Sequence, residues 1–203
     1  MKYDFTNIKA NLEKKGYKVC VFDKKESAAE YLKSQINGKT VGFGGSVTLH
    51  EMNLYDILSK NNNVLWHDRK PEGMSIMETR TEACRAEVYI SSVNGISEDG
   101  QIINIDNTGN RVAAISYGPN KVYLIIGVNK IAPDFESAIY RARNIAGPLN
   151  AQRLKRNTPC AVKGDKCYDC ASPERICRNL SVLWEKPTGA EYEIILINEK
   201  LGY

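Results

Sequence analysis

The chain has 203 residues, of which 42% are hydrophobic and 26% are charged, and its formal net charge is +4. This is an ordinary globular composition, and the length is sufficient to bury a substantial core. The basic residues alternate with acidic ones instead of forming a stripe, and no segment approaches the roughly 18 apolar residues of a membrane span. We therefore expect neither a nucleic-acid-binding protein nor a membrane protein.

Helices and strands alternate in the first half of the predicted structure. Phe5, Ile8 and Leu12 recur at helical spacing and predict an amphipathic helix over residues 1–15. Thr48 and Glu51 stand three apart, as in a capping box, and predict the start of another helix. Further helices are expected at 27–36 and 76–85, and strands at 17–22, 40–43 and 64–66. The alternation predicts the α/β class, with an open, mostly parallel sheet flanked by helices on both faces.

The second half begins with strand-like runs that no helix separates, at residues 88–91, 101–105, 112–116 and 121–127. Such close spacing predicts antiparallel pairing or a lateral extension of the sheet. A helix is expected over 133–145, ending before Gly147 and Pro148, and a final strand over 191–197. We expect a single α/β domain over residues 1–203, with a cysteine-rich loop at 158–178 inserted before the last strand.

A glycine-rich turn separates an expected strand from an expected helix. It consists of Gly44, Gly45 and Ser46, with Thr48 two residues further on. Free backbone N–H groups at such a turn can hold a phosphate or carboxylate. The dinucleotide pattern G-x-G-x-x-G is incomplete here, and a merely tight connection is the alternative interpretation. His50 lies in the first turn of the expected helix. It could act as a general acid or base, or it could be a solvated surface group.

Small polar residues are dense in two loops, at 91–100 and 105–111. A purely structural interpretation is that the two loops are hairpin turns, in which such residues are common. The functional interpretation assigns ligand binding to Asn94, Asn110 and Arg111, because a guanidinium matches a carboxylate or phosphate. Glu98 offers a carboxylate for acid, base or nucleophilic catalysis, and Lys130 could add a cation to the same rim.

Four cysteines are clustered near the C-terminus with the spacing C-x6-C-x2-C-x6-C: Cys160, Cys167, Cys170 and Cys177. No apolar run follows a basic start at the beginning of the chain, so we expect no secretory signal and a cytoplasmic location. In a reducing compartment, clustered thiols are more often metal ligands or redox thiols than structural disulfides. Four thiolates suit one tetrahedral zinc or one iron–sulfur cluster, and the sequence does not choose between them. Redox disulfides or free thiols without any cofactor are the alternative.

Several of these segments together resemble the LUD (lactate utilization) domain family. They are Gly-Phe-Gly-Gly-Ser-Val-Thr, Asn-Gly-Ile-Ser-Glu-Asp-Gly, Asp-Asn-Thr-Gly-Asn-Arg-Val-Ala-Ala-Ile-Ser-Tyr-Gly-Pro-Asn-Lys-Val and Gly-Pro-Leu-Asn-Ala. The resemblance covers nearly the whole chain. It implies an open α/β fold like that of ribose-5-phosphate isomerase, glucosamine-6-phosphate isomerase and CoA transferases. It also implies a ligand-binding loop at Gly44–Ser46 and an association with lactate oxidation alongside iron–sulfur proteins.

Three functional hypotheses follow. The first is a protein that binds a small anionic metabolite, such as a carboxylate, phosphate or CoA ester, in lactate or organic-acid utilization, as an accessory subunit or a catalyst. The second is an enzyme similar to a CoA transferase or sugar-phosphate isomerase, with Glu98 as nucleophile or base. The third is a non-catalytic module whose cysteine loop docks an iron–sulfur or other redox partner. A homodimer is compatible with all three.

Overall fold

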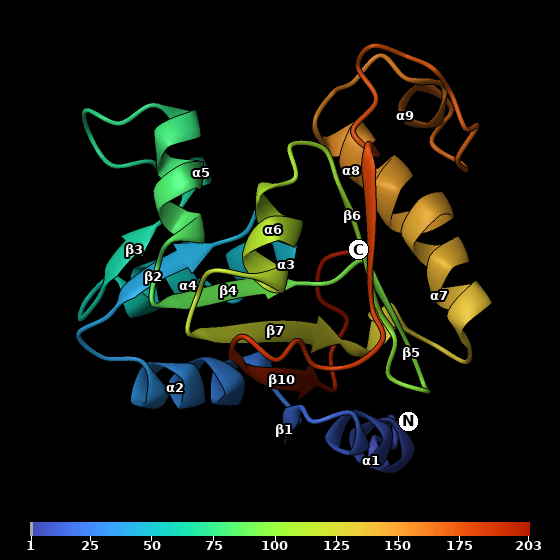
Figure 1. Ribbon diagram of the computed structural model, residues 1–203. Coiled ribbons are helices and arrows are strands. Elements are labelled where there is room, and N and C mark those ends of the chain that lie inside the picture. The colour runs from blue at the N-terminus through green and yellow to red at the C-terminus, as the bar shows by residue number, and fades with distance from the viewer. Residues whose placement is uncertain (1) are drawn as a thin grey trace.

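The computed structural model describes residues 2–203, and its centre is a six-stranded sheet. The strands are β1 (Lys18–Phe22), β2 (Thr40–Phe43), β3 (Asn63–Leu65), β4 (Val88–Ser92), β7 (Lys121–Gly127) and β10 (Glu191–Ile197). Their order is β1-β10-β7-β4-β2-β3, and every neighbouring pair is parallel. The last strand of the chain therefore lies inside the sheet, between β1 and β7 (Figure 1). Its near-continuous apolar run is typical of a strand covered on both faces.

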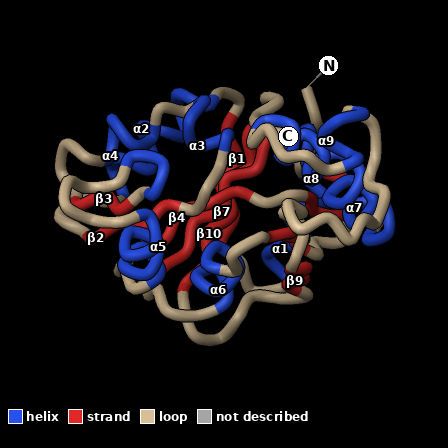
Figure 2. Tube along the Cα trace, turned by 90° about the horizontal axis from the view of Figure 1, so that it is seen from above, coloured by secondary structure: helices blue, strands red, loops and turns tan. Residues whose placement is uncertain are grey.

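Helices cover both faces of this sheet, as the sequence predicts (Figure 2). One face carries α2 (Lys25–Gln35), α3 (Val47–Glu51) and α4 (Leu54–Leu58), and the other carries α1 (Thr6–Lys14), α5 (Ile76–Cys84) and α6 (Asn110–Ser116). Each layer has its own apolar core. The largest fully buried side chains are Trp66 and Tyr123 in the first core and Tyr89 in the second.

The remaining strands form a separate four-stranded sheet with the order β8-β5-β6-β9. They are β5 (Gly95–Ser97), β6 (Ile102–Asp106), β8 (Ile131–Ala132) and β9 (Asn179–Leu183). β6 pairs antiparallel with β5 and β9, whereas β5 and β8 are parallel. The expected antiparallel extension is thus a second sheet, packed against α7 (Phe135–Arg141) through a small apolar cluster that includes Ile103 and Ala138.

Residues 112–116 were predicted to form a strand, and this prediction is wrong because they belong to α6. A short apolar run does not distinguish a strand from a buried helix by periodicity alone. Gly109 supplies the φ of +91° that turns the chain into the helix, and its N–H donates to Asp106 Oδ1 at 2.9 Å. That turn is one in which glycine is favoured, since its φ lies in the left-handed region.

Two predicted helix boundaries are also wrong. The helix expected to end at 145 continues through one π-helical turn (η3, Ala142–Ala146) into α8 (Gly147–Arg153), with Pro148 in the first turn of α8. The proline follows a π-helical hydrogen bond, from the Gly147 N–H to the Ala142 carbonyl oxygen, so the regular i→i−4 pattern is already interrupted before it. The residue that caps α3 is Ser46 rather than Thr48, since Ser46 Oγ accepts from the Leu49 N–H at 3.4 Å. A capping box does occur at α5, between Ser75 and Glu78.

The cysteine segment begins with a one-turn helix, α9 (Pro159–Lys163), and continues as irregular chain to β9. In Figure 1, α8 and α9 lie to one side of the main sheet and α5 rises on the opposite side. Within residues 2–203, no helix combines the length and apolarity that crossing a membrane requires.

Candidate functional site

A cavity of about 310 Å³ lies at the carboxyl ends of the parallel strands. Segments that follow β2, β3, β4 and β7 contribute to its wall, and residues of α5, α6 and α8 complete it. Ligands of open parallel sheets bind outside the carboxyl ends of the strands, where loops from neighbouring strands converge. The wall includes six residues predicted from the sequence to bind a ligand: Gly45, Ser46, Asn94, Asn110, Arg111 and Lys130.

The two glycines of the turn after β2 have close neighbours where a side chain would begin. A Cβ on Gly44 would lie 2.5 Å from Ser91 Oγ, and one on Gly45 would lie 3.3 Å from the imidazole of His67. Gly44 thus allows β2 and β4 to approach each other behind the cavity, while Gly45 brings backbone to the cavity wall. The turn is therefore a structural requirement as well as part of the cavity.

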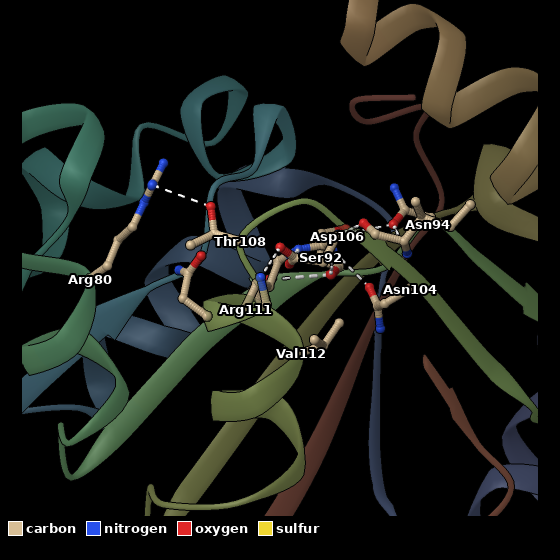
Figure 3. Close-up of polar contacts among 12 residues, drawn as sticks. Arg80, Ser92, Asn94, Asn104, Asp106, Thr108, Arg111 and Val112 are labelled. Atoms are coloured by element: carbon tan, nitrogen blue, oxygen red, sulfur yellow. Dashed lines mark hydrogen bonds and ion pairs between the residues drawn. The ribbon is translucent and has the colours of Figure 1, made fainter. Parts of the chain in front are cut away.

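Arg111 is the centre of a polar network in one wall (Figure 3). Its Nε donates to Asp106 Oδ2 at 3.3 Å. One terminal nitrogen donates to Asn104 Oδ1 at 2.7 Å and to the Ser92 carbonyl oxygen at 3.3 Å. The other donates to Asn94 Oδ1 at 3.0 Å and to the Ile105 carbonyl oxygen at 2.5 Å. A guanidinium has five N–H donors, so all five are engaged within the protein. This arrangement ties α6 to β6 and to the end of β4.

Three other arginines line the cavity: Arg80 of α5, Arg153 of α8 and Arg156 just beyond it. Arg80 reaches Thr108 Oγ1 only at 3.4 Å, and its buried Nε has no partner within residues 2–203 (Figure 3). Arg153 donates to Asn150 Oδ1 at 3.0 and 3.1 Å. These side chains retain donors that a bound anion could accept from.

His67 and Asp68 follow β3 in a short 3-10 turn (η1, His67–Arg69) and both line the cavity. Asp68 lies between two histidines, with Oδ1 3.5 Å from His67 Nε2 and Oδ2 3.0 Å from His50 Nε2. Burial lowers the pKa of His67 below its usual value, although the neighbouring Asp68 opposes this effect. A neutral imidazole in a cavity can accept or deliver a proton near pH 7.

Lys130 ends the 3-10 turn that follows β7 (η2, Val128–Lys130) and is only 3% exposed. Its Nζ donates to Ser92 Oγ at 2.8 Å and to Thr48 Oγ1 at 3.0 Å. Burial lowers the pKa of Lys130 to about 7, and the positive charges of Arg141 and Arg111 act in the same direction. Thr48, expected in the ligand site, is thus fully buried behind the lysine.

The structure places Glu98 outside this cavity. It follows β5, where its backbone oxygen accepts from Asn11 Nδ2 of α1 at 2.8 Å. Burial raises the pKa of its carboxyl group, and the adjacent Asp99 adds to the effect. Its predicted catalytic role therefore has no support from proximity to Lys130 or His67.

The four clustered cysteines are free thiols in partly buried positions. Cys177 accepts from Arg175 at 3.4 Å, and Cys160 Sγ lies 3.3 Å from Thr158 Oγ1. Cys167 and Cys177 line a smaller cavity of about 200 Å³. Over residues 2–203, no three His, Cys, Asp or Glu side chains are grouped to hold a metal ion. The zinc or iron–sulfur assignment stays a prediction.

Comparison with known proteins identifies the family. The model of the LUD domain matches residues 6–197. The chain belongs to the LUD domain family. The crystal structure of a DUF162 family protein from Deinococcus radiodurans is similar over 96% of this chain and 99% of that one, with 12% identity and a TM-score of 0.53, which supports the shared fold. Ribose 5-phosphate isomerase from Plasmodium falciparum matches 54% of this chain and 52% of its own, with 14% identity and a TM-score of 0.34. A comparison with curated proteins finds no match.

In this LUD domain, the cavity contains residues that sequence reasoning missed. They are His67, Asp68, Arg80, Asp106, Arg153 and Tyr203. The sequence could have indicated His67 and Asp68, because they follow the strand predicted at 64–66 and the carboxyl ends of parallel strands lie at one edge of the sheet. No sequence signal pointed to Arg80 or Arg153, since helices at opposite sides of the sheet bring them to the cavity.

Proposed function

We propose that this LUD domain binds a small anionic metabolite, carrying a carboxylate or phosphate, in the cavity at the carboxyl ends of the strands. The observation that supports this most directly is the charge of the wall. Among the described lining residues, four arginines, Arg80, Arg111, Arg153 and Arg156, outnumber the two carboxylates of Asp68 and Asp106. Asp106 is already paired with Arg111, so the positive charge remains in excess.

The family suggests the context in which such a ligand is used. A role in lactate or organic-acid utilization, as an accessory subunit or as a catalyst, agrees with a cavity that contains cations and a buried imidazole. Arg80 is the cation that we expect to contact the ligand, because its Nε is buried without a partner. An unpaired buried donor costs free energy that a bound anion would recover.

Thermal unfolding with inorganic phosphate, L-lactate, pyruvate and acetyl-CoA at matched ionic strength tests this function. A ligand at 100 times its dissociation constant stabilises by about 2.7 kcal/mol, which corresponds to a rise in Tm of roughly 5–10 °C for a chain of this size. Arg80→Gln should abolish the rise. Arg85→Gln is the matched control, since Arg85 follows the same helix but pairs with Glu82 on the surface. If none of these anions raises Tm, or if Arg80→Gln responds as the wild type does, the proposal fails.

A further inference from the structure

Lys130 differs from an ordinary ligand-binding lysine because no carboxylate forms an ion pair with it among the described residues. The side chain is nevertheless almost completely buried and lines the cavity. A buried ammonium without a counter-charge is unfavourable, so the surroundings favour the neutral amine.

The hydrogen bonds around Lys130 match a neutral amine. Ser92 Oγ donates its own proton to the Ile125 carbonyl oxygen at 2.6 Å, and Thr48 Oγ1 donates to the Leu201 carbonyl oxygen at 3.3 Å. Both hydroxyl oxygens therefore act as acceptors towards Lys130 Nζ, at 2.8 and 3.0 Å. A neutral amine has two N–H donors, which these two acceptors satisfy, and one lone pair, which is left free.

The charges around the amine act in the same direction. Burial has the largest effect on the pKa of Lys130 and lowers it to about 7, followed by the positive charges of Arg141 and Arg111, while Glu51 opposes them weakly. At neutral pH the amine of Lys130 is then unprotonated in a large fraction of the molecules. An unprotonated lysine in a desolvated site is a nucleophile towards carbonyl carbons.

We propose that Lys130 forms a Schiff base with the carbonyl group of an anionic oxo compound bound in the cavity. The substrate class is a 2-oxo acid or a phosphorylated ketose or aldose, whose carbonyl carbon lies a few bonds from the anionic group. This inference rests on the proposed function, because the arginines would hold the anionic group while the amine reacts. It goes further by naming the reacting atom and the class of substrate.

The reaction balances without an oxidant or reductant. Nζ attacks the carbonyl carbon, the C=O π electrons move to oxygen, and proton transfer from nitrogen to oxygen gives a carbinolamine. Loss of water, with one further proton taken up by the leaving oxygen, forms the C=N bond. Counted from the protonated lysine, an ammonium ion and a carbonyl compound give a protonated imine and one water. His67 lines the same cavity and is a candidate for the group that carries the proton.

Reductive trapping tests the proposal. The full chain is incubated at pH 7.5 with pyruvate or with dihydroxyacetone phosphate, reduced with sodium cyanoborohydride, digested and mapped by mass spectrometry. At this pH an ordinary lysine is unprotonated in about one molecule in a thousand, whereas an amine that titrates near neutrality is mostly unprotonated. Before differences in accessibility are counted, Lys130 should therefore be labelled on the order of several hundred-fold more than any other lysine. The expected result is one adduct per chain, on Lys130, with one of the two probes. The probe that reacts distinguishes a carboxylate from a phosphate substrate.

Variants and binding data separate this inference from the proposed function. Lys130→Met should form no adduct. Lys121→Arg, which removes the lysine at the amino end of β7 but keeps its charge beside Glu193, should react as the wild type does. Peptide mapping of the wild type decides the question even if Lys130→Met fails to fold. Absence of an adduct with both probes, or labelling spread over surface lysines, overturns the Schiff base. A rise in Tm with pyruvate or dihydroxyacetone phosphate but no adduct would leave the binding function standing.

Discussion

Asp106 and Arg111 form an ion pair inside the cavity wall, with 3.3 Å between Asp106 Oδ2 and Arg111 Nε and side-chain exposures of 9% and 12%. The pair joins the end of β6 to the first turn of α6. Every other donor of Arg111 is also engaged, so this arginine connects the elements that form the wall. A cation with five satisfied donors has little capacity for another acceptor.

Arg111→Lys should therefore lower the stability of the protein. An ammonium has three donors at one point and cannot reach the acceptors that a planar guanidinium reaches. We expect a loss of about 1–3 kcal/mol in the free energy of unfolding, measured by urea denaturation. Arg85→Lys, at a surface ion pair with Glu82, should change it by less than about 0.5 kcal/mol. Equal stability of Arg111→Lys and the wild type would contradict the assigned role.

His67 should titrate below the usual histidine pKa of about 6.5. Burial favours its neutral form, so the folded state takes up its proton at a lower pH than the unfolded state does. Stability is then lost as the pH falls from about 6.5 through the folded-state pKa. NMR titration of the His50→Asn variant, which retains His67 as its only histidine, measures this directly. A midpoint at or above 6.5 would contradict the prediction.

Gly44→Ala should be strongly destabilising. Its Cβ would lie 2.5 Å from Ser91 Oγ, 3.1 Å from Ser91 Cβ and 3.1 Å from Tyr89 Oη, so the buried Ser91 side chain would have to shift. Overpacking of this kind costs about 1–3 kcal/mol in the free energy of unfolding. Gly189→Ala is the control, because the nearest atom to its Cβ would be Tyr117 Cδ2 at 3.9 Å. Chemical denaturation of both variants should separate them, and similar stabilities would show that the turn has more room than described.

Glu193→Gln should also destabilise the fold. The carboxylate is fully buried in β10, where it accepts from Tyr31 Oη at 2.6 Å and lies 3.1 Å from Lys18 Nζ. We expect a loss of about 1–3 kcal/mol at pH 7. The same change at Glu191, which is exposed on the same strand, should be nearly neutral.

The effect at Glu193 should depend on pH. Burial raises its pKa, but hydrogen bonds from Tyr31, Lys18 and Cys20 and the charge of Lys121 outweigh this, and the net pKa is lowered. A lowered carboxylate pKa contributes stability that is present above about pH 4.3 and is lost as the pH falls through the folded-state pKa. The difference between wild type and Glu193→Gln should therefore shrink on acidification, and a widening difference would contradict the assignment.

The cysteine segment should carry a metal in protein purified without oxygen. Four thiolates within residues 160–177 match the ligand number of zinc or of one iron–sulfur cluster, and binding would draw the thiolates together. Metal analysis and absorption spectroscopy decide between them: brown protein with broad absorption indicates iron, and colourless protein with one equivalent of zinc indicates zinc. Cys167→Ser should lose the metal and Cys20→Ser should keep it. Protein purified in this way that contains neither iron nor zinc would contradict the prediction.

The sequence by itself determined the parallel sheet, its helical layers and the location of the glycine turn. Local patterns carry this information, because alternating strands and helices permit few topologies and a glycine turn after a strand lies at the carboxyl edge. The same local patterns misassigned residues 112–116, where a short apolar run fits either a strand or a helix.

Only the tertiary structure decided which side chains meet. Lys130 contacts Thr48, 82 positions away, because η2 and α3 follow neighbouring regions of the same sheet edge. Arg111 was predicted to bind a ligand from its charge, yet the acceptors that surround it come from β4 and β6 and occupy its donors. The chemistry of a buried cation depends on the partners that folding supplies, and residue type alone does not contain that information.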